Sequence, residues 1–523
     1  MELESLHLLS LMIFLPLAGA LMIGILPARE YALARGFGLA WSGAVFILGI
    51  LLWLGFDPNT PGLQFVEKAS WIPSLGIGYH LAVDGLSLPF ILLTAFIVPL
   101  SIVASIDALK KVAKGFVLSV LLFESAALGA FASQDLFLFY IFSEFALIPL
   151  FVFIAIWGDR NRSYSAIKLF LYPAAASCLL LVAMLWLYFE NATQFKSYST
   201  DLATLAATAL PQGTQMLLFS AFAVAFMVRS AIFPFHSWLT DAIDAAPPAA
   251  TILIPALLLK LGLYGMARVA LPLFPLGADS MLTIVASFAV VGFVWCALAA
   301  LAQKRLRRMV AYLLASQMGL AFFGLAVMNV EGVSGAFYLA ISHGIAGTLL
   351  LIVVGLYERA NADDRIDANR HPLRFLPWLT FMLTMAALGL GGLPVAAGFP
   401  GVFYVLYGAI GHNGLSGSLP LALISVFGLL VFVCGLAWMV QRMVFGSYTA
   451  PERPLRIKLR EYLLLVPLAL LILLLGLFPS YFVRGLENSA TQLVDGYRDK
   501  VVLEDSQEEP QIAVQNITKE REE

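Results

Sequence analysis

The clearest absence in this 523-residue sequence is charge, because only 12% of the residues are Asp, Glu, Lys or Arg. Hydrophobic residues make up 61% of the chain, and the mean hydropathy is +0.89. A water-soluble protein of this length needs far more polar surface than that composition supplies. The composition therefore excludes a soluble globular enzyme and indicates a membrane protein.

Cysteine is also scarce: the chain has three, Cys178, Cys296 and Cys434, each within an apolar run. Their spacing matches no metal site or iron–sulfur cluster, so we interpret them as small core residues. The sequence also lacks a phosphate-binding Gly-rich loop, a dinucleotide-binding fingerprint and a CxxC pair. We therefore expect no cofactor and no metal on this chain.

Long apolar runs dominate what the sequence does contain. Runs of about 20 residues have the length of a membrane-crossing helix, so we expect an all-α polytopic membrane protein with about 14 transmembrane helices. The first run follows Glu2 and Glu4 instead of a basic region, so we expect no cleavable signal peptide. The expected spans are 8–27, 36–56, 86–107, 115–133, 136–157, 166–189, 215–235, 249–275, 281–302, 309–329, 334–356, 375–410, 418–440 and 461–482.

Basic residues are distributed unevenly between the two ends of these spans. If the spans alternate in direction, the loops on the other side hold only Lys68 and Lys196 before the C-terminal tail. Cytoplasmic loops are enriched in Lys and Arg, which places both termini outside the cytoplasm and makes the helix number even. The loops with 21 of the 31 Lys and Arg residues are 28–35, 108–114, 158–168, 303–308, 357–374 and 441–460.

Three basic residues lie within the spans: Arg229, Lys260 and Arg268. Arg268 is near the end of its span and can snorkel to water. Arg229 and Lys260 are nearer the membrane centre, where an unpaired charge costs ~3 kcal/mol or more. For these two residues we expect a functional role.

Proline and glycine interrupt two of the apolar runs, near Pro234 and near 394–400. Broken helices beside buried bases form ion paths, and breaks at matching places in two halves indicate inverted repeats. We expect a membrane domain at 1–482, with repeats at approximately 115–275 and 281–440. The remaining residues, 483–523, form a polar acidic tail that we expect to be exposed and partly disordered.

Titratable residues within the spans are candidates for carrying protons. Glu144 lies about halfway along its span, where a neighbouring charge can switch its protonation; a purely structural ion pair is the alternative. Glu124 is a weaker candidate of the same kind. His343 is expected to relay protons, the alternative being a hydrogen-bonded core residue. For His236, in the first break, two roles stay open: binding freed backbone groups, or joining the relay.

Five motifs together resemble the antiporter-like subunits of respiratory complex I and of multi-subunit cation/proton antiporters. Within that family the chain is most similar to subunit M of NADH–quinone oxidoreductase, also called subunit 4, and is related to the D subunit of Na⁺/H⁺ antiporters. The resemblance implies two inverted five-helix repeats and a multi-pass location in the bacterial inner (plasma) membrane. The motifs lie at 80–90, 135–144, 233–265, 307–319 and 339–350.

The resemblance also implies roles for three residues. Glu144 matches the essential glutamate of the family's fifth helix, and Lys260 matches its central lysine. His343 matches the histidine of the second half-channel. These residues would form a proton path across the membrane.

Three positions depart from the family pattern. Arg229 stands where a lysine is usual, and because arginine is never deprotonated it can hold Glu144 ionised but cannot pass a proton on. Gln317 replaces a histidine and can hydrogen-bond a water chain without titrating. Val402 replaces a glutamate or lysine, so the ionisable group at the outer end of the path is lost.

The resemblance implies a proton-translocating membrane subunit of a complex I-like NADH–quinone oxidoreductase, which is a translocase of the respiratory chain. NADH, FMN, iron–sulfur clusters and quinone are expected on partner subunits. The expected partners are neighbouring membrane subunits and the lipid bilayer, not nucleic acid. The alternatives are a subunit of a Na⁺/H⁺ antiporter, of a membrane hydrogenase or of an inorganic-carbon uptake complex, or a non-conducting structural spacer. The identity of the co-purifying subunits would distinguish them.

Overall fold

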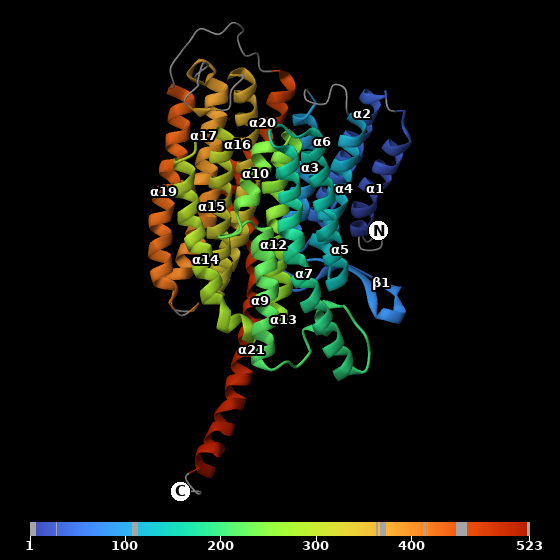
Figure 1. Cartoon of the computed structure of the whole chain (residues 1–523), viewed down its shortest axis with the longest axis vertical. Helices are drawn as coiled ribbons and strands as arrows, with labels where there is room; N and C mark the ends of the chain where they lie inside the picture. The colour runs from blue at the N-terminus through green and yellow to red at the C-terminus, as the bar shows by residue number, and fades with distance from the viewer. Residues whose placement is uncertain are drawn as a thin grey trace.

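The computed structural model describes residues 7–27, 29–106, 113–361, 365–366, 373–411, 415, 417–445 and 458–519. Its helices run side by side in one bundle (Figure 1), as expected for a polytopic membrane protein. In the described ranges, eleven helices are long and apolar enough to cross a membrane, and three shorter apolar helices accompany them. The expected total of 14 helices stays a prediction.

The first half of the bundle contains most of the irregular helices. Its elements are α1 (Leu8–Ile25), α2 (Tyr31–Gly55), β1 (Gln64–Ile72), η2 (Pro73–Leu75), β2 (Ile77–Val83), α3 (Leu88–Ala104), α4 (Ala113–Ala132), α5 (Leu136–Phe145), α6 (Leu147–Trp157), α7 (Arg162–Phe195), α8 (Leu202–Leu205), α9 (Gln212–Arg229), α10 (Ser237–Ala245), α11 (Pro248–Leu253), η3 (Ile254–Leu258), α12 (Leu259–Gly265), η4 (Met266–Ala270) and α13 (Leu271–Leu273).

The second half is built from longer helices. Its elements are α14 (Pro275–Leu301), α15 (Leu306–Ala326), α16 (Val330–Asn361), η6 (Leu373–Phe375), α17 (Pro377–Gly391), α18 (Gly398–Ile410), α19 (Ser418–Phe445), α20 (Leu459–Leu477) and α21 (Pro479–Lys519).

Burial separates the inner helices from the outer ones. The most apolar stretch of Pro248–Leu273 is completely buried, and α15 and α16 are almost as enclosed. The outer helices α7 and α19 instead expose large apolar side chains such as Val182 and Leu423. Since these residues would face hydrocarbon or a neighbouring subunit, the apolar exterior fits a membrane environment.

Both predicted helix breaks are present. The first apolar run ends as α9 at Arg229, and the chain resumes as α10 at Ser237. The second run ends as α17 at Gly391, where Gly392 takes a left-handed conformation with φ 64°, and resumes as α18. The span with Lys260 is also irregular, because two π-helical turns, η3 and η4, flank α12.

A β-hairpin between α2 and α3 was not predicted from the apolar runs. Strands β1 and β2 pair antiparallel, with Lys68 opposite His80, at the lower end of the bundle in Figure 1. His80 Nδ1 lies 2.7 Å and Lys68 Nζ 3.1 Å from Asp201 Oδ2. These polar contacts attach the hairpin to the segment that precedes α8.

The expectation of an exposed and partly disordered tail is wrong for its first part. Residues 479–519 form α21, and the later part of this helix projects from the lower end of the bundle (Figure 1). An apolar stripe at helical spacing buries one side of this helix. The stripe consists of Val483, Leu486, Ala490, Val494 and Tyr497. Residues 520–523 of the predicted tail lie outside the described residues.

Candidate functional site: two buried polar clusters

The first buried polar cluster joins α5, α7 and α9. Arg229, the last residue of α9, forms an ion pair with Glu144 of α5. Ser177 of α7 donates to Glu144 Oε1 at 2.6 Å and accepts from Arg229 Nη2 at 3.0 Å. Arg229 is 2% exposed, whereas 24% of the Glu144 side chain is exposed. The guanidinium therefore holds the carboxylate from within the bundle, while the carboxylate stays accessible from the bundle surface.

The helix break after α9 lies next to this cluster, and side chains of the break donate hydrogen bonds to nearby backbone carbonyl groups. Trp238 Nε1 donates to Val228 O at 2.9 Å, and the Ser230 hydroxyl donates to Leu259 O at 2.7 Å. A freed carbonyl in the membrane interior would otherwise be costly. These two bonds stabilise the broken helix next to Arg229 and connect it to α12.

The second cluster lies at the centre of the bundle, between α12 and α16. Lys260 and His343 are 0% and 1% exposed, and Lys260 Nζ is hydrogen-bonded to His343 Nδ1. Lys260 Nζ also donates to Pro255 O at 2.7 Å and lies 3.6 Å from Met318 Sδ. Pro255 belongs to the π-helical turn η3, where a carbonyl is available to a side chain five residues later. None of the ion pairs formed by the described residues includes Lys260.

His343 is oriented as a proton acceptor for Lys260. Its Nε2 lies 3.1 Å from Leu314 O, and since a carbonyl only accepts, Nε2 carries the hydrogen. In the neutral ring, Nδ1 then has a lone pair, which faces the Lys260 ammonium. A proton can therefore pass from Lys260 Nζ to His343 Nδ1 along an existing hydrogen bond.

The second helix break lies beyond this pair and contains no titratable side chain. Gln317 of α15 donates through Nε2 to Leu390 O at 2.9 Å, and Ser342 of α16 donates to Gly389 O at 3.4 Å. Both carbonyls belong to the last turn of α17, which has no helical N–H groups to satisfy them. Val402 is buried on the first turns of α18. The break is thus satisfied by polar but non-ionisable groups.

Glu124 and His236 stay outside the two clusters. Glu124 on α4 is fully buried, and neither carboxyl oxygen has a hydrogen-bond partner in the described ranges. The His236 ring centroid lies 5.9 Å from that of Phe233 and 5.8 Å from that of Tyr312, and its Nδ1 also has no partner there. Of the two roles left open for His236, the binding of freed backbone groups through Nδ1 is not observed.

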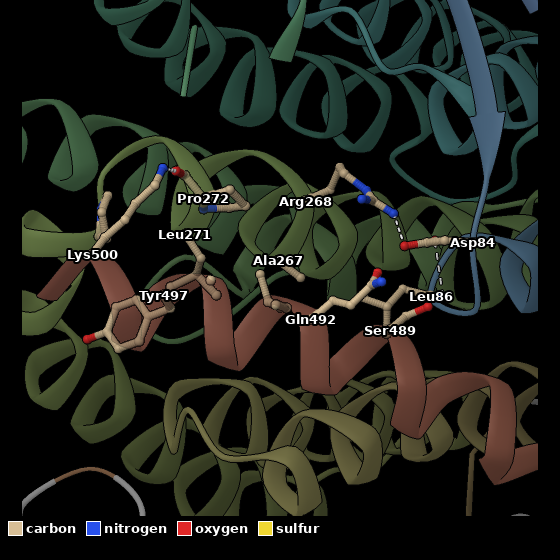
Figure 2. Close-up of a pocket in the computed structure, with 13 residues that line it drawn as sticks. Asp84, Leu86, Ala267, Arg268, Leu271, Pro272, Ser489, Gln492, Tyr497 and Lys500 are labelled. Atoms are coloured by element: carbon tan, nitrogen blue, oxygen red, sulfur yellow. Dashed lines mark hydrogen bonds and ion pairs between the residues drawn. The ribbon is translucent and has the colours of Figure 1, made fainter. Parts of the chain in front are cut away.

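Arg268 forms an ion pair with Asp84 instead of snorkelling to water (Figure 2). Asp84 Oδ1 accepts the backbone N–H groups of Leu86 and Ser87 at 3.1 and 2.9 Å, so this carboxylate also organises the turn before α3. The pair borders a cavity of about 240 Å³ between η4, α13 and α21, to which Ser489 also contributes. Because the carboxylate has several donors, its role is structural: it ties α3 to the outer end of the Lys260 helix.

Sequence reasoning missed two polar partners, Ser177 and Asp84. A single serine in the apolar run of α7 carries no local signal, because its role depends on helices α5 and α9. Asp84 had a signal, since Asp-Gly-Leu-Ser before an apolar run is a turn-forming sequence. Within the described part of the chain, no three His, Cys, Asp or Glu side chains come together to hold a metal ion.

Comparisons with known proteins place this geometry in context. The family described as "NADH:quinone oxidoreductase/Mrp antiporter" matches residues 133–431, and that of the amino terminus of NADH-ubiquinone oxidoreductase chain 4 matches 62–128. NADH-quinone oxidoreductase subunit M of Rhodobacter capsulatus is 36% identical over 510 residues, covering 94% of this chain and 97% of the relative. NADH-ubiquinone oxidoreductase chain 4 of Marchantia polymorpha is 31% identical over 491 residues, covering 93% and 97%.

Solved structures have the same fold. A chain of respiratory complex I from Thermus thermophilus superimposes with a TM-score of 0.84 at 26% identity, covering 94% of this chain and 99% of that one. A chain of the Mrp complex from Dietzia sp. DQ12-45-1b gives a TM-score of 0.78 at 21% identity, covering 92% of this chain and 52% of that one. At that identity the second match is evidence for the fold alone.

Proposed function

Since this chain belongs to the family of membrane subunits shared by NADH:quinone oxidoreductases and Mrp antiporters, we propose that it carries a proton path. The polar clusters around Glu144 and Lys260 form that path. The chain is a proton-translocating subunit of a complex I-like NADH:quinone oxidoreductase in the bacterial inner membrane. Electron transfer in other subunits drives protons across it.

The observation that carries this proposal is the hydrogen bond between Lys260 and His343. Two bases buried in an apolar bundle cannot both hold a charge without strong repulsion, so the pair holds a single excess proton. That proton can reside on either nitrogen, and the preference changes when a charge nearby changes. A pair whose proton moves when a nearby charge changes is what a driven proton path needs at its centre.

Glu144 is proposed as the uptake group on the cytoplasmic side. Its carboxylate can bind a proton, and the Arg229 guanidinium compensates its negative charge within the bundle. Protonation of Glu144 weakens the ion pair and changes the charge that Lys260 experiences through the adjacent break. The proton then leaves by way of Lys260 and His343 towards the outside.

The remaining expectations about organisation are part of the same proposal. We propose that 115–275 and 281–440 are the two inverted repeats of the 1–482 membrane domain, since each contains one broken helix. We also propose that this chain binds no redox cofactor. NADH, FMN, iron–sulfur clusters and quinone would then bind to partner subunits, and neighbouring antiporter-like subunits would contact this chain within the bilayer.

The experiment that tests the proposed function is NADH-driven proton pumping in membrane vesicles containing a verified, assembled complex. A Glu144→Gln, Lys260→Ala double variant should pump fewer protons per NADH, because the uptake group and the central base are both lost. Thr193→Val, a substitution at an exposed hydroxyl of α7, serves as the control. Unchanged pumping by the double variant would refute the proton path.

A non-conducting spacer is the second candidate function, and Val402 is the observation that favours it. A spacer needs no ionisable group at the outer end of the path, and the second break contains none. It predicts that Glu144→Gln and Lys260→Ala affect assembly alone. The buried, mutually hydrogen-bonded Lys260 and His343 argue against a spacer. Burying two ionisable side chains in an apolar core costs free energy that apolar side chains would not cost.

A further inference from the structure

The outer half of the proton path lacks its expected terminal group in this chain. Val402 cannot carry a proton, and Gln317 is bound to Leu390 O at the second break. If His343 receives protons from Lys260, as the proposed function requires, they need another way to the outer surface. Helix α16, which carries His343, begins near that surface at Val330.

A polar stripe runs along α16 from its outer end to Ser342, the residue that precedes His343. Glu331, Ser334, Tyr338 and Ser342 follow one another at spacings of three, four and four residues, which places them on one face of the helix. Ser334, Tyr338 and Ser342 are at most 2% exposed. Buried polar side chains of a membrane protein face its interior, where they bind other helices or line a path for ions or protons.

Two hydroxyl groups of this stripe, those of Tyr338 and Ser342, bond to other helices instead of their own. Serine and threonine within helices of this protein typically donate to the carbonyl four residues earlier, as Thr348 does to Gly344 O at 2.7 Å. Ser342 instead donates across to α17, and Tyr338 Oη donates to Leu475 O of α20 at 2.5 Å. Ser334 Oγ has no partner among the described residues. A buried hydroxyl left open in this way is a position for an ordered water.

Carboxylates and a phenol meet at the outer end of the stripe. Glu331 lies in the first turn of α16 and is half-buried. Tyr404 of α18 donates to Glu487 Oε1 of α21 at 3.2 Å, and α16 packs against both α18 and α21. Three helices therefore converge where the stripe reaches the surface, and two of their side chains can release a proton to outside water.

We propose that protons leave His343 along this face of α16, with Tyr338 as the relay and Glu331 as the release group. The inference deepens the proposed function and rests on it. Because these groups lie about one helical turn apart, ordered water has to connect them. Each hydroxyl accepts a proton on a lone pair from the water on its inner side and gives up its own proton to the water on its outer side, so no bond other than O–H or N–H changes. The Glu331 carboxylate accepts the proton and then yields it to outside water. No step on this route requires an ionisable group at Val402.

The test measures protons pumped per NADH by assembled complexes in inside-out vesicles. The flux removed by Lys260→Ala is the reference. Tyr338→Phe and Glu331→Gln should each remove about 99% of that flux, because a positioned proton-transfer group contributes a factor of roughly 10² or more to the transfer rate. Thr348→Val is the matched control: it is buried on the same helix, on the cytoplasmic side of His343, and should leave the flux unchanged.

A second-site variant separates conduction from packing. Val402→Glu restores an ionisable group at the second break, so it should recover flux in Tyr338→Phe but not in Lys260→Ala. Full flux in both Tyr338→Phe and Glu331→Gln, with flux lost in Lys260→Ala, would overturn the α16 route and leave the proposed function standing. Full flux in Lys260→Ala would overturn both.

Discussion

Lys260 and His343 are hydrogen-bonded at the centre of the bundle although 83 residues separate them in the chain. The lysine comes from the irregular helix of the first half, and the histidine from the long helix α16 of the second half. The contact therefore joins the two proposed repeats in the buried interior of the bundle. A change of charge in either half is felt by the other through this pair.

Lys260→Arg should abolish the contribution of this chain to pumping although it keeps the positive charge. Arginine does not release its proton, so His343 would receive none from it. We expect Lys260→Arg to lose the same proton flux per NADH as Lys260→Ala does. Proton flux per NADH in vesicles measures it. Normal flux in Lys260→Arg would mean that charge alone, without titration, is sufficient.

Asp84→Asn should lower stability without altering the proton path. It leaves the Arg268 guanidinium in a largely buried site without its carboxylate, which costs about 3–5 kcal/mol in comparable pairs. The unfolding midpoint of the detergent-solubilised complex should fall accordingly. Replacing both residues, by Asp84→Asn with Arg268→Met, should recover much of the loss. Lower pumping per assembled complex in Asp84→Asn would instead assign this pair to the path.

Gly262→Ala should destabilise the crossing of α9 and α12. A Cβ atom at this position would collide with Ser230 Oγ and Phe226 O, at the point where the first break meets the Lys260 helix. Such overpacking costs about 1–3 kcal/mol. Gly355→Ala on α16 is the matched control, since a Cβ there meets nothing within 4 Å. Thermal unfolding of the two variants compares them, and equal midpoints would contradict the tight crossing.

Asp201 should make the docking of the hairpin depend on pH. The hydrogen bond to His80, followed by that to Lys68, holds the pKa of Asp201 well below its usual range, although burial acts in the opposite direction. Because the folded pKa is depressed, the stabilisation is complete above the unfolded pKa of about 3.9 and is lost as the pH falls below it.

The unfolding midpoint of the wild-type complex should therefore drop more steeply below about pH 4 than that of Asp201→Asn, which cannot titrate there. The midpoint is measured in detergent over a pH series. Asp159→Asn provides a control carboxylate outside the hairpin contacts. Parallel curves for wild type and Asp201→Asn would show that this carboxylate does not couple hairpin docking to pH.

Local pattern was sufficient for much of the architecture. Apolar runs, Pro and Gly positions and the uneven distribution of Lys and Arg are properties of neighbouring residues, and they predicted the membrane bundle, its two breaks and the isolated bases Arg229 and Lys260. The hairpin was missed, because short strands between spans have neither the length nor the hydropathy of a helix. The buried stripe of α21 was missed because its many polar residues lowered the average hydropathy of the tail.

The sequence by itself determined which residues could titrate within the membrane and which could not, since Arg229, Gln317 and Val402 are chemical identities. Only the tertiary structure decided the partners: Ser177 with Glu144, His343 with Lys260, and Asp84 with Arg268. The reason is that a buried polar group takes whatever partner the packing of distant helices brings within hydrogen-bond reach. That packing depends on contacts among side chains far apart in the chain, and no local pattern encodes it.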